Sequence, residues 1–220
     1  MAKRDAPLTL SQGAKTYLWD LAWDDKYDTH SDIESKYLDK GIYCEPEAIQ
    51  IYASVKGEHL IFKNEERFTN DYVTGEPDLI FDDKIVDIKC SWSNSTYKKV
   101  VRENKLPSLY YYQVMAYMWL TGKTKAEVAY VLCNTPEHLF NKELENKKWQ
   151  VRDNKGVLDL SAEDESNIYE SLYKEHHFDN MSFERRVHVF EVEAEQTIFW
   201  EMQKRIELAQ EYYEETYRSI

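Results

Sequence analysis

The sequence predicts an α/β fold in which a mixed central β-sheet is flanked by helices. Helix-spaced apolar residues fill the first quarter of the chain, short strand-like runs follow, and helix and strand periods then alternate. Only six glycines and five prolines occur among 220 residues, so long flexible linkers are not expected. A chain of this length can bury a substantial core, and we expect a single domain over residues 1–220.

Helices are expected before the first strand. Apolar residues at helical spacing predict a helix over 9–24. Ser31, followed three residues later by Glu34, has the pattern of a capping box and predicts a second helix start. A longer helix is predicted over about 43–55, with Gly57 placed to end it.

Strand patterns begin after this helix. Runs at 59–62 and 67–73 are expected to be strands, and residues 74–75 are expected to form a turn. The apolar run 79–81 and the alternating run 84–90 are separated by two aspartates, which suit a tight turn. These last two runs therefore predict a β-hairpin.

The second half of the chain continues the alternation. Residues 91–106 are polar and basic and are expected to form a loop or a short helix. Pro107 and Gly122 are suited to begin and end the next helix. The remaining predicted elements are a strand over 126–133, helices near 137–146 and 161–175, a strand over 186–192 and a long closing helix over 193–217.

Composition limits the classes of function. Acidic residues outnumber basic ones by 41 to 28, and a net charge of −13 argues against a protein that coats nucleic acid through its overall charge. Cys44, Cys90 and Cys133 are scattered and predict neither a zinc site nor a disulfide framework. No apolar stretch follows the first basic residues, and no run is long enough to cross a membrane. We therefore expect a cytoplasmic protein without a membrane partner.

Charged residues interrupt the predicted hairpin. Asp87 and Lys89 lie two apart on one strand, so both side chains project from the same face. Asp78 begins the preceding strand, and the hairpin would bring its carboxylate near Asp87. A simple ion pair between Asp87 and Lys89 is one interpretation. The other is a divalent cation site, because two adjacent carboxylates repel unless a cation lies between them.

The chemistry of such a site can be stated from its donors. Carboxylate oxygens select Mg²⁺ or Mn²⁺ rather than zinc. Lys89 beside the ion could orient a water, help to deprotonate it, or stabilise charge on a phosphate. Together these groups favour hydrolysis of a phosphodiester bond.

The order Pro77-Asp78, eight residues, then Asp87-Ile88-Lys89 resembles the signature of the PD-(D/E)xK nuclease superfamily. Upstream, Gly41-Ile-Tyr-Cys-Glu45-Pro-Glu-Ala48 is similar to a helix of phage lambda exonuclease-type and RecB-type nucleases, whose glutamate faces the metal. Downstream, Tyr110-Tyr-Tyr-Gln113-Val-Met-Ala-Tyr117 resembles the family's QxxxY helix. The resemblance covers about residues 37–134, and the strand and long helix over 186–218 are compatible with the family's C-terminal end.

This resemblance implies a restriction-endonuclease-like core and a role for each matched residue. Glu45, Asp78 and Asp87 would hold Mg²⁺ or Mn²⁺, with the Ile88 carbonyl as an additional ligand. Glu47, two positions from Glu45, is the competing acid. The implied catalytic set is completed by Lys89, which acts on water or phosphate, and by Gln113 and Tyr117, which help to position them; a core helix with a buried glutamine is the alternative for Gln113.

The sequence departs from its relatives in three ways. Family members with an iron–sulfur cluster need four cysteines, so no cluster is expected here. Glu76 stands where lambda-type enzymes have a serine of the 5′-phosphate pocket, which puts a 5′→3′ polarity in doubt. No helicase or nucleotide-binding motif is present.

Polar and basic residues directly follow the catalytic strand. Ser91, Trp92, Lys98, Lys99 and Arg102 would suit contacts to a nucleic-acid backbone, and a solvated basic loop is the alternative. The histidines at 138, 176 and 177 are expected to lie on the surface and to bind no metal.

We therefore predict a metal-dependent DNA nuclease, with an exonuclease of phage recombination type favoured. A structure-specific or restriction-type endonuclease is one alternative, and a catalytically weak nucleic-acid-binding protein on a nuclease scaffold is another. The resemblance implies DNA as a partner, a single-strand-annealing or recombination protein as a second partner, and a homo-oligomer in the form of a trimeric ring. It places a phage-encoded protein in the host cytoplasm.

Overall fold

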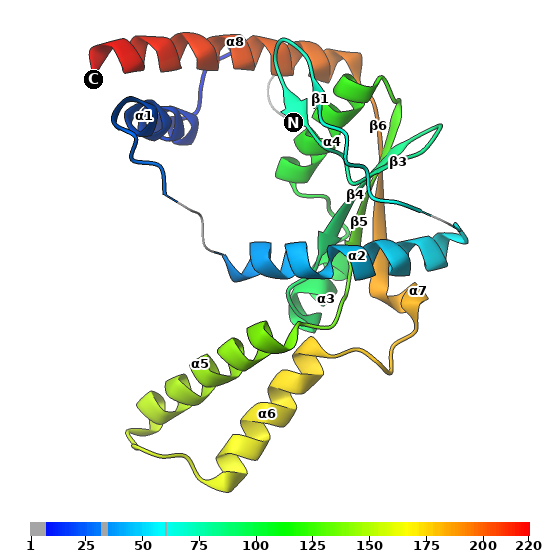
Figure 1. Ribbon diagram of the computed structural model, residues 1–220, viewed down its shortest axis with the longest axis vertical. Helices are drawn as coiled ribbons and strands as arrows, with labels where there is room; N and C mark the ends of the chain where they lie inside the picture. The colour runs from blue at the N-terminus through cyan, green and yellow to red at the C-terminus, as the bar shows by residue number, and fades with distance from the viewer. Residues whose placement is uncertain (1–7, 32–34, 60) are drawn as a thin grey trace.

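The computed structural model describes residues 8–31, 35–59 and 61–220 and has a mixed sheet at its centre (Figure 1). The four strands of this sheet lie in the order β3–β4–β5–β6. Strand β4 is antiparallel to β3 and parallel to β5, and β5 is antiparallel to β6. The predicted fold class, a mixed sheet flanked by helices, is confirmed.

The elements follow one another in an order close to the predicted one. They are α1 (Gln12–Tyr27), α2 (Lys36–Lys56), β1 (Phe68–Thr69), β2 (Thr74–Gly75), β3 (Leu79–Ile80), β4 (Ile85–Cys90), α3 (Asn94–Glu103), α4 (Ser108–Thr121), β5 (Lys125–Val131), α5 (Glu137–Lys155), α6 (Ala162–His176), α7 (Phe183–Arg186), β6 (Val187–Glu193) and α8 (Gln196–Ser219).

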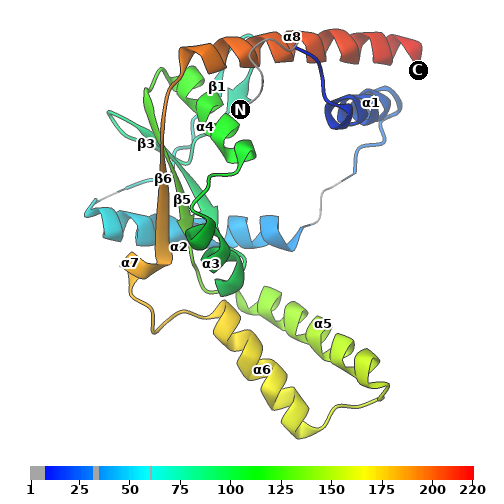
Figure 2. The same ribbon diagram turned by 180° about the vertical axis from the view of Figure 1, so that it is seen from behind.

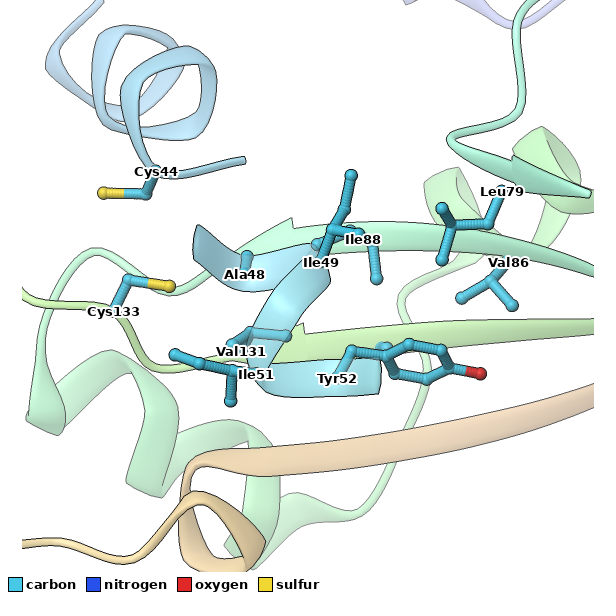
Figure 3. Close-up of a cluster of buried hydrophobic side chains, with 11 residues drawn as sticks. Cys44, Ala48, Ile49, Ile51, Tyr52, Leu79, Val86, Ile88, Val131 and Cys133 are labelled. Carbon is cyan, nitrogen blue, oxygen red and sulfur yellow. The ribbon is translucent and has the colours of Figure 1, made fainter. Parts of the chain in front are cut away.

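Alternate residues of β4 pack into two different cores. Val86 and Ile88 lie in a cluster with Ala48 and Ile51 of α2, which covers one face of the sheet (Figure 3). Ile85 lies in a second cluster with Met115 and other residues of α4 on the opposite face. Because side chains alternate along a strand, Asp87 and Lys89 share the α4 face with Ile85.

Helix α2 is longer than the two separate segments predicted from the sequence. It runs without a break from Lys36 to Lys56 and contains Pro46. Burial of Ala48 and Ile51 against the sheet compensates for the hydrogen bond that a proline cannot make. Ser35 is the N-cap residue in place of the predicted Ser31, whose partner Glu34 lies outside the described residues.

The segment between α2 and β3 differs from its prediction. Residues 59 and 61–62 are not a strand, and residue 60 lies outside the described part. The predicted strand 67–73 is limited to β1, and Thr74–Gly75 forms the returning strand β2 instead of a turn. Asn70 makes the turn, because its Oδ1 accepts hydrogen bonds from the amides of Tyr72 and Val73.

The remaining elements occur in the predicted order, but most of their first and last residues differ from the predicted ones. The segment expected as a loop or a short helix is helix α3, which Ser93 and Thr96 begin with a capping box. Helix α1 packs against α8, and α5 packs against α6 as a helical pair that projects from the sheet (Figure 2). Among the residues described, no helix combines the length and the apolar character needed to span a membrane.

The prediction of three surface histidines is wrong for His176. Its side chain is 2% exposed, and Nδ1 lies 2.8 Å from Oγ1 of Thr135. That oxygen also accepts a hydrogen bond of 2.9 Å from Nζ of Lys40, so the Thr135 proton is directed at the imidazole. Burial, aided by the nearby Lys40, lowers the pKa of His176 to about 4.

Candidate active site

Strand β4 places a carboxylate and an ammonium side by side below α4. Asp87 is only 2% exposed, and Nζ of Lys89 lies 2.8 Å from its Oδ2. Lys89 also lies over the ring of Tyr110, 4.7 Å from the centroid. The ion pair considered in the sequence analysis therefore forms, but it is not isolated from other charges.

The hairpin brings Asp78 to the same place. Pairing of Leu79 with Val86 sets the register, and Oδ2 of Asp78 accepts a 2.6 Å hydrogen bond from the amide of Ile88. Burial and the adjacent charge of Asp87 raise the pKa of Asp78 to about 7, against the effect of that hydrogen bond. Burial also raises the pKa of Asp87, although Lys89 partly offsets it. The two carboxylates thus repel each other in a site with little water.

Helix α2 contributes the third acid, Glu45. Glu45 forms an ion pair with Lys63, and Glu47 instead pairs with Arg186 at 3.2 Å. Lys63 is held near the site by its neighbour Asn64, whose amide donates to the Asp78 carbonyl at 2.8 Å. Of the two candidate glutamates, Glu45 lines the same pocket as Asp78 and Asp87, and Glu47 does not.

Helix α4 borders the site on the side of Asp87 and Lys89. Nε2 of Gln113 donates a 2.9 Å hydrogen bond to the hydroxyl of Tyr117, as the spacing of four residues on a helix allows. The ring of Tyr117 packs so closely on Gly75 that a Cβ there would lie 2.5 Å from Cε1. The glycine therefore allows the close approach of β2 and α4.

One pocket of about 680 Å³ joins these elements. It is lined by all of the predicted catalytic and metal residues and by two of the predicted nucleic-acid contacts: Glu45, Asp78, Asp87, Ile88, Lys89, Gln113, Tyr117, Ser91 and Trp92. The other three predicted contacts, Lys98, Lys99 and Arg102, line a different groove on the far side of α3. Nine of the twelve predicted site residues, from four parts of the chain, therefore lie in one pocket, and the other three lie outside it.

The residues that line the pocket include the oxygen donors that a divalent cation site needs. Oδ2 of Asp87 is buried and faces the Lys89 ammonium at 2.8 Å, a contact that lies outside hydrogen-bond geometry. Carboxylate oxygens are the ligands that Mg²⁺ and Mn²⁺ prefer. Across residues 8–31, 35–59 and 61–220, no three acidic, histidine or cysteine side chains yet converge closely enough to hold an ion. Glu45 engages Lys63 in this arrangement and would have to exchange it for the metal.

Sequence reasoning missed Lys63 and Asn64. Neither belongs to a recognisable motif, and both lie in the unassigned segment between the predicted strands 59–62 and 67–73. Asn64 binds the Pro77 carbonyl through its side chain at 3.0 Å, in addition to its backbone bond to Asp78. Only the folded chain shows that this segment crosses the acidic site.

The chain was compared with protein families, with curated protein sequences and with solved structures. Residues 11–124 match the family described as the YqaJ-like viral recombinase domain. No curated protein sequence matches the chain significantly. A phage-related exonuclease from Haemophilus somnus 129PT is similar in structure, with a TM-score of 0.69 and 24% identity over 94% of this chain and 83% of that chain.

A second solved structure has the same fold at lower identity. The alkaline exonuclease LHK-Exo from Laribacter hongkongensis has a TM-score of 0.62 and 12% identity over 96% of this chain and 84% of that chain. Its complex with dAMP gives a TM-score of 0.62 and 14% identity over 96% of this chain and 85% of that chain.

Proposed function

This chain belongs to the YqaJ-like viral recombinase domain family, and from that membership we propose that it is a Mg²⁺- or Mn²⁺-dependent deoxyribonuclease that degrades DNA from its ends. The family and the fold support a phage-type exonuclease. LHK-Exo has been crystallised in complex with dAMP, and we propose a deoxynucleotide as the product of this chain as well.

The observation that carries the proposal is the pair of carboxylates beside one lysine. Asp78 and Asp87 are largely withdrawn from water and repel each other, and the Lys89 ammonium pairs with Asp87 at 2.8 Å. Such an arrangement is costly in a protein that has no use for it. A divalent cation bound between the carboxylates would remove the cost of their repulsion. The positive charge of that cation is what phosphodiester hydrolysis needs beside the phosphate.

The roles of the side chains follow from their places. Glu45, Asp78, Asp87 and the Ile88 carbonyl would hold the cation, which when bound polarises a phosphate oxygen and lowers the pKa of water. Lys89, already oriented by Asp87 and Tyr110, would orient the attacking water or stabilise the phosphate. Four more predicted residues line the pocket. Gln113 and Tyr117 would position the reacting groups, and Ser91 and Trp92 would border the substrate.

One experiment tests the activity and its site together. Linear duplex, single-stranded and closed circular DNA are incubated with Mn²⁺, with and without chelator, and the parent is compared with Asp87→Ala. Asp83→Ala is the matched control, because Asp83 lies in the same hairpin but is exposed in its turn. We expect the parent and the control to degrade linear DNA only with metal, and Asp87→Ala to be inactive.

The other outcomes identify the alternatives. Cleavage of closed circles would indicate an endonuclease, since a circle has no end. Binding of DNA without cleavage under any metal would indicate a nuclease scaffold that has lost catalysis. Equal cleavage by Asp87→Ala and the parent would show that the site is wrong.

The assembly is a separate proposal. By resemblance to lambda-type enzymes we propose a homo-oligomer, a trimeric ring around DNA, that works with a single-strand-annealing or recombination protein. Light scattering of the purified protein measures its oligomeric state, and a monomer at all concentrations would contradict the proposed ring.

A further inference from the structure

A second groove of about 1070 Å³ lies on the side of α3 that faces away from the catalytic pocket. One wall is α3 itself, and the other is the segment from Met181 through α7 into the start of β6. Buried Tyr97 contributes to its lining together with Met181 and Val187. The groove is therefore built from two elements that are far apart in the sequence.

The groove concentrates positive charge in an acidic protein. Lys98, Lys99 and Arg102 project from α3, Arg185 projects from α7, and the lining contains one carboxylate, Glu184. The four cations are exposed, whereas the whole chain has a net charge of −13. Such a local excess against the overall sign favours a polyanionic ligand.

These cations are available to a ligand. Arg102 approaches the neighbouring Glu103 only at 3.9 Å, and in the described part of the chain Lys98, Lys99 and Arg185 form no ion pair. The adjacent Arg186, by contrast, is 4% exposed and paired with Glu47. The exposed cations are thus not used to hold the fold together.

Helix α3 links this groove to the catalytic pocket. Thr96 and Val100 lie four residues apart and line the pocket, while Lys98 and Arg102 have the same spacing and line the groove. The two sites are therefore separated by about the diameter of one helix, roughly 10 Å. A DNA duplex carries a charge every 1.7 Å or so along its axis and can contact both sites at once.

We propose that this groove binds the phosphate backbone of DNA outside the catalytic pocket, and so retains the substrate between cleavage events. The inference rests on the proposed nuclease function for the identity of the polyanion. It gives Lys98, Lys99 and Arg102, which the sequence predicted to contact a nucleic-acid backbone, a place in a groove separate from the metal residues. It also adds Arg185, which no sequence pattern indicated, as the cation of the opposite wall.

The test compares two double variants of the full chain that remove equal charge. Lys98→Gln/Lys99→Gln alters the groove, and Lys142→Gln/Lys147→Gln removes two exposed lysines from α5. Binding of a fluorescent linear duplex is followed by anisotropy in chelator, at several salt concentrations. Each lost phosphate contact lowers the slope of log affinity against log salt by about 0.9, so the groove variant should lose about 1.8 and the control nothing.

Arg185→Gln provides an independent check, with an expected loss of about 0.9 in the same slope. Equal slopes for the groove variant and the control would overturn the proposal, because bulk charge alone would then explain binding. Unchanged slopes for both the lysine and arginine variants would overturn it as well. Binding of an acidic polypeptide in place of DNA would also count against it.

A second readout separates this proposal from the nuclease function. The p-nitrophenyl ester of thymidine 5′-monophosphate is a small substrate that fits the catalytic pocket but is too short to reach the groove. Its Mn²⁺-dependent hydrolysis therefore requires the catalytic pocket alone. We expect the groove variant to hydrolyse it at the parental rate. Loss of this rate in the groove variant would refute a separate binding site, whereas no hydrolysis by the parent would refute the nuclease function and leave the binding result standing.

Discussion

Substitution of Asp78 by asparagine should stabilise the metal-free protein at high pH. Asparagine keeps an oxygen that can accept the 2.6 Å hydrogen bond from the Ile88 amide, and it removes the charge that faces Asp87. The folded protein holds the pKa of Asp78 at about 7, whereas the ordinary value is 3.8. Between these two pH values the folded state binds more protons than the unfolded state, so the free energy of unfolding falls as pH rises.

The magnitude follows from the same two values. One pKa unit corresponds to about 1.4 kcal/mol, so the difference between 3.8 and about 7 corresponds to about 4 kcal/mol above pH 7. Asp78 is partly exposed and shares its repulsion with Asp87, and solvent screening reduces the cost. We therefore expect Asp78→Asn to raise the free energy of unfolding by about 2 kcal/mol at pH 8 and by little at pH 5.

Urea denaturation in chelator at these two pH values measures the effect. Asp83→Asn, in the exposed turn of the same hairpin, should change stability at neither pH. Added Mn²⁺ should stabilise the parent more than Asp78→Asn, because the cation relieves the repulsion that the variant lacks. If Asp78→Asn is less stable than the parent at both pH values, the carboxylate serves the fold and the reasoning from charge repulsion is refuted.

Three further predictions concern other parts of the structure. Lys63→Met should free Glu45 and raise Mn²⁺ affinity about fivefold in calorimetry, equivalent to about 1 kcal/mol for a partly exposed ion pair; weaker binding would show that Lys63 supports the metal site instead. The low pKa of His176, about 4 against an ordinary 6.5, predicts stability that is complete above pH 6.5 and falls by up to about 3 kcal/mol as pH drops to 4. Urea titrations should show a smaller acid loss in His176→Asn, and an equal loss would assign it to other groups. Gly75→Ala should displace Tyr117 and lower the DNA cleavage rate roughly tenfold or more in a protein that circular dichroism shows to be folded, whereas an unchanged rate would mean that the ring moves without consequence.

The sequence predicted much of the fold because most elements carry their own local signals. The hairpin β3–β4 was predicted from two apolar runs around an aspartate turn, and α4 from a proline at its start and a glycine after its end. The prediction failed where local signals were weak or misleading. Helix α2 begins at Lys36, well before the predicted start near residue 43, and the short strands β1 and β2 are paired around a turn made by Asn70.

Residue spacing by itself determined the centre of the candidate site. Alternation along one strand requires Asp87 and Lys89 to share a face, and a tight hairpin requires Asp78 to lie near them. These relations involve neighbours in the chain, so local geometry is enough to establish them. The resemblance then associated Glu45, Gln113 and Tyr117 with the same centre.

Only the tertiary structure decided how distant segments meet. Packing of α2 on the sheet brings Glu45 rather than Glu47 to the pocket, and a loop with no motif delivers Lys63 to it. The orientation of α3 separates Lys98 from the acids that it follows in the sequence and places it opposite Arg185. These contacts depend on which faces of the helices are buried against other elements, and periodicity within one segment does not contain that information.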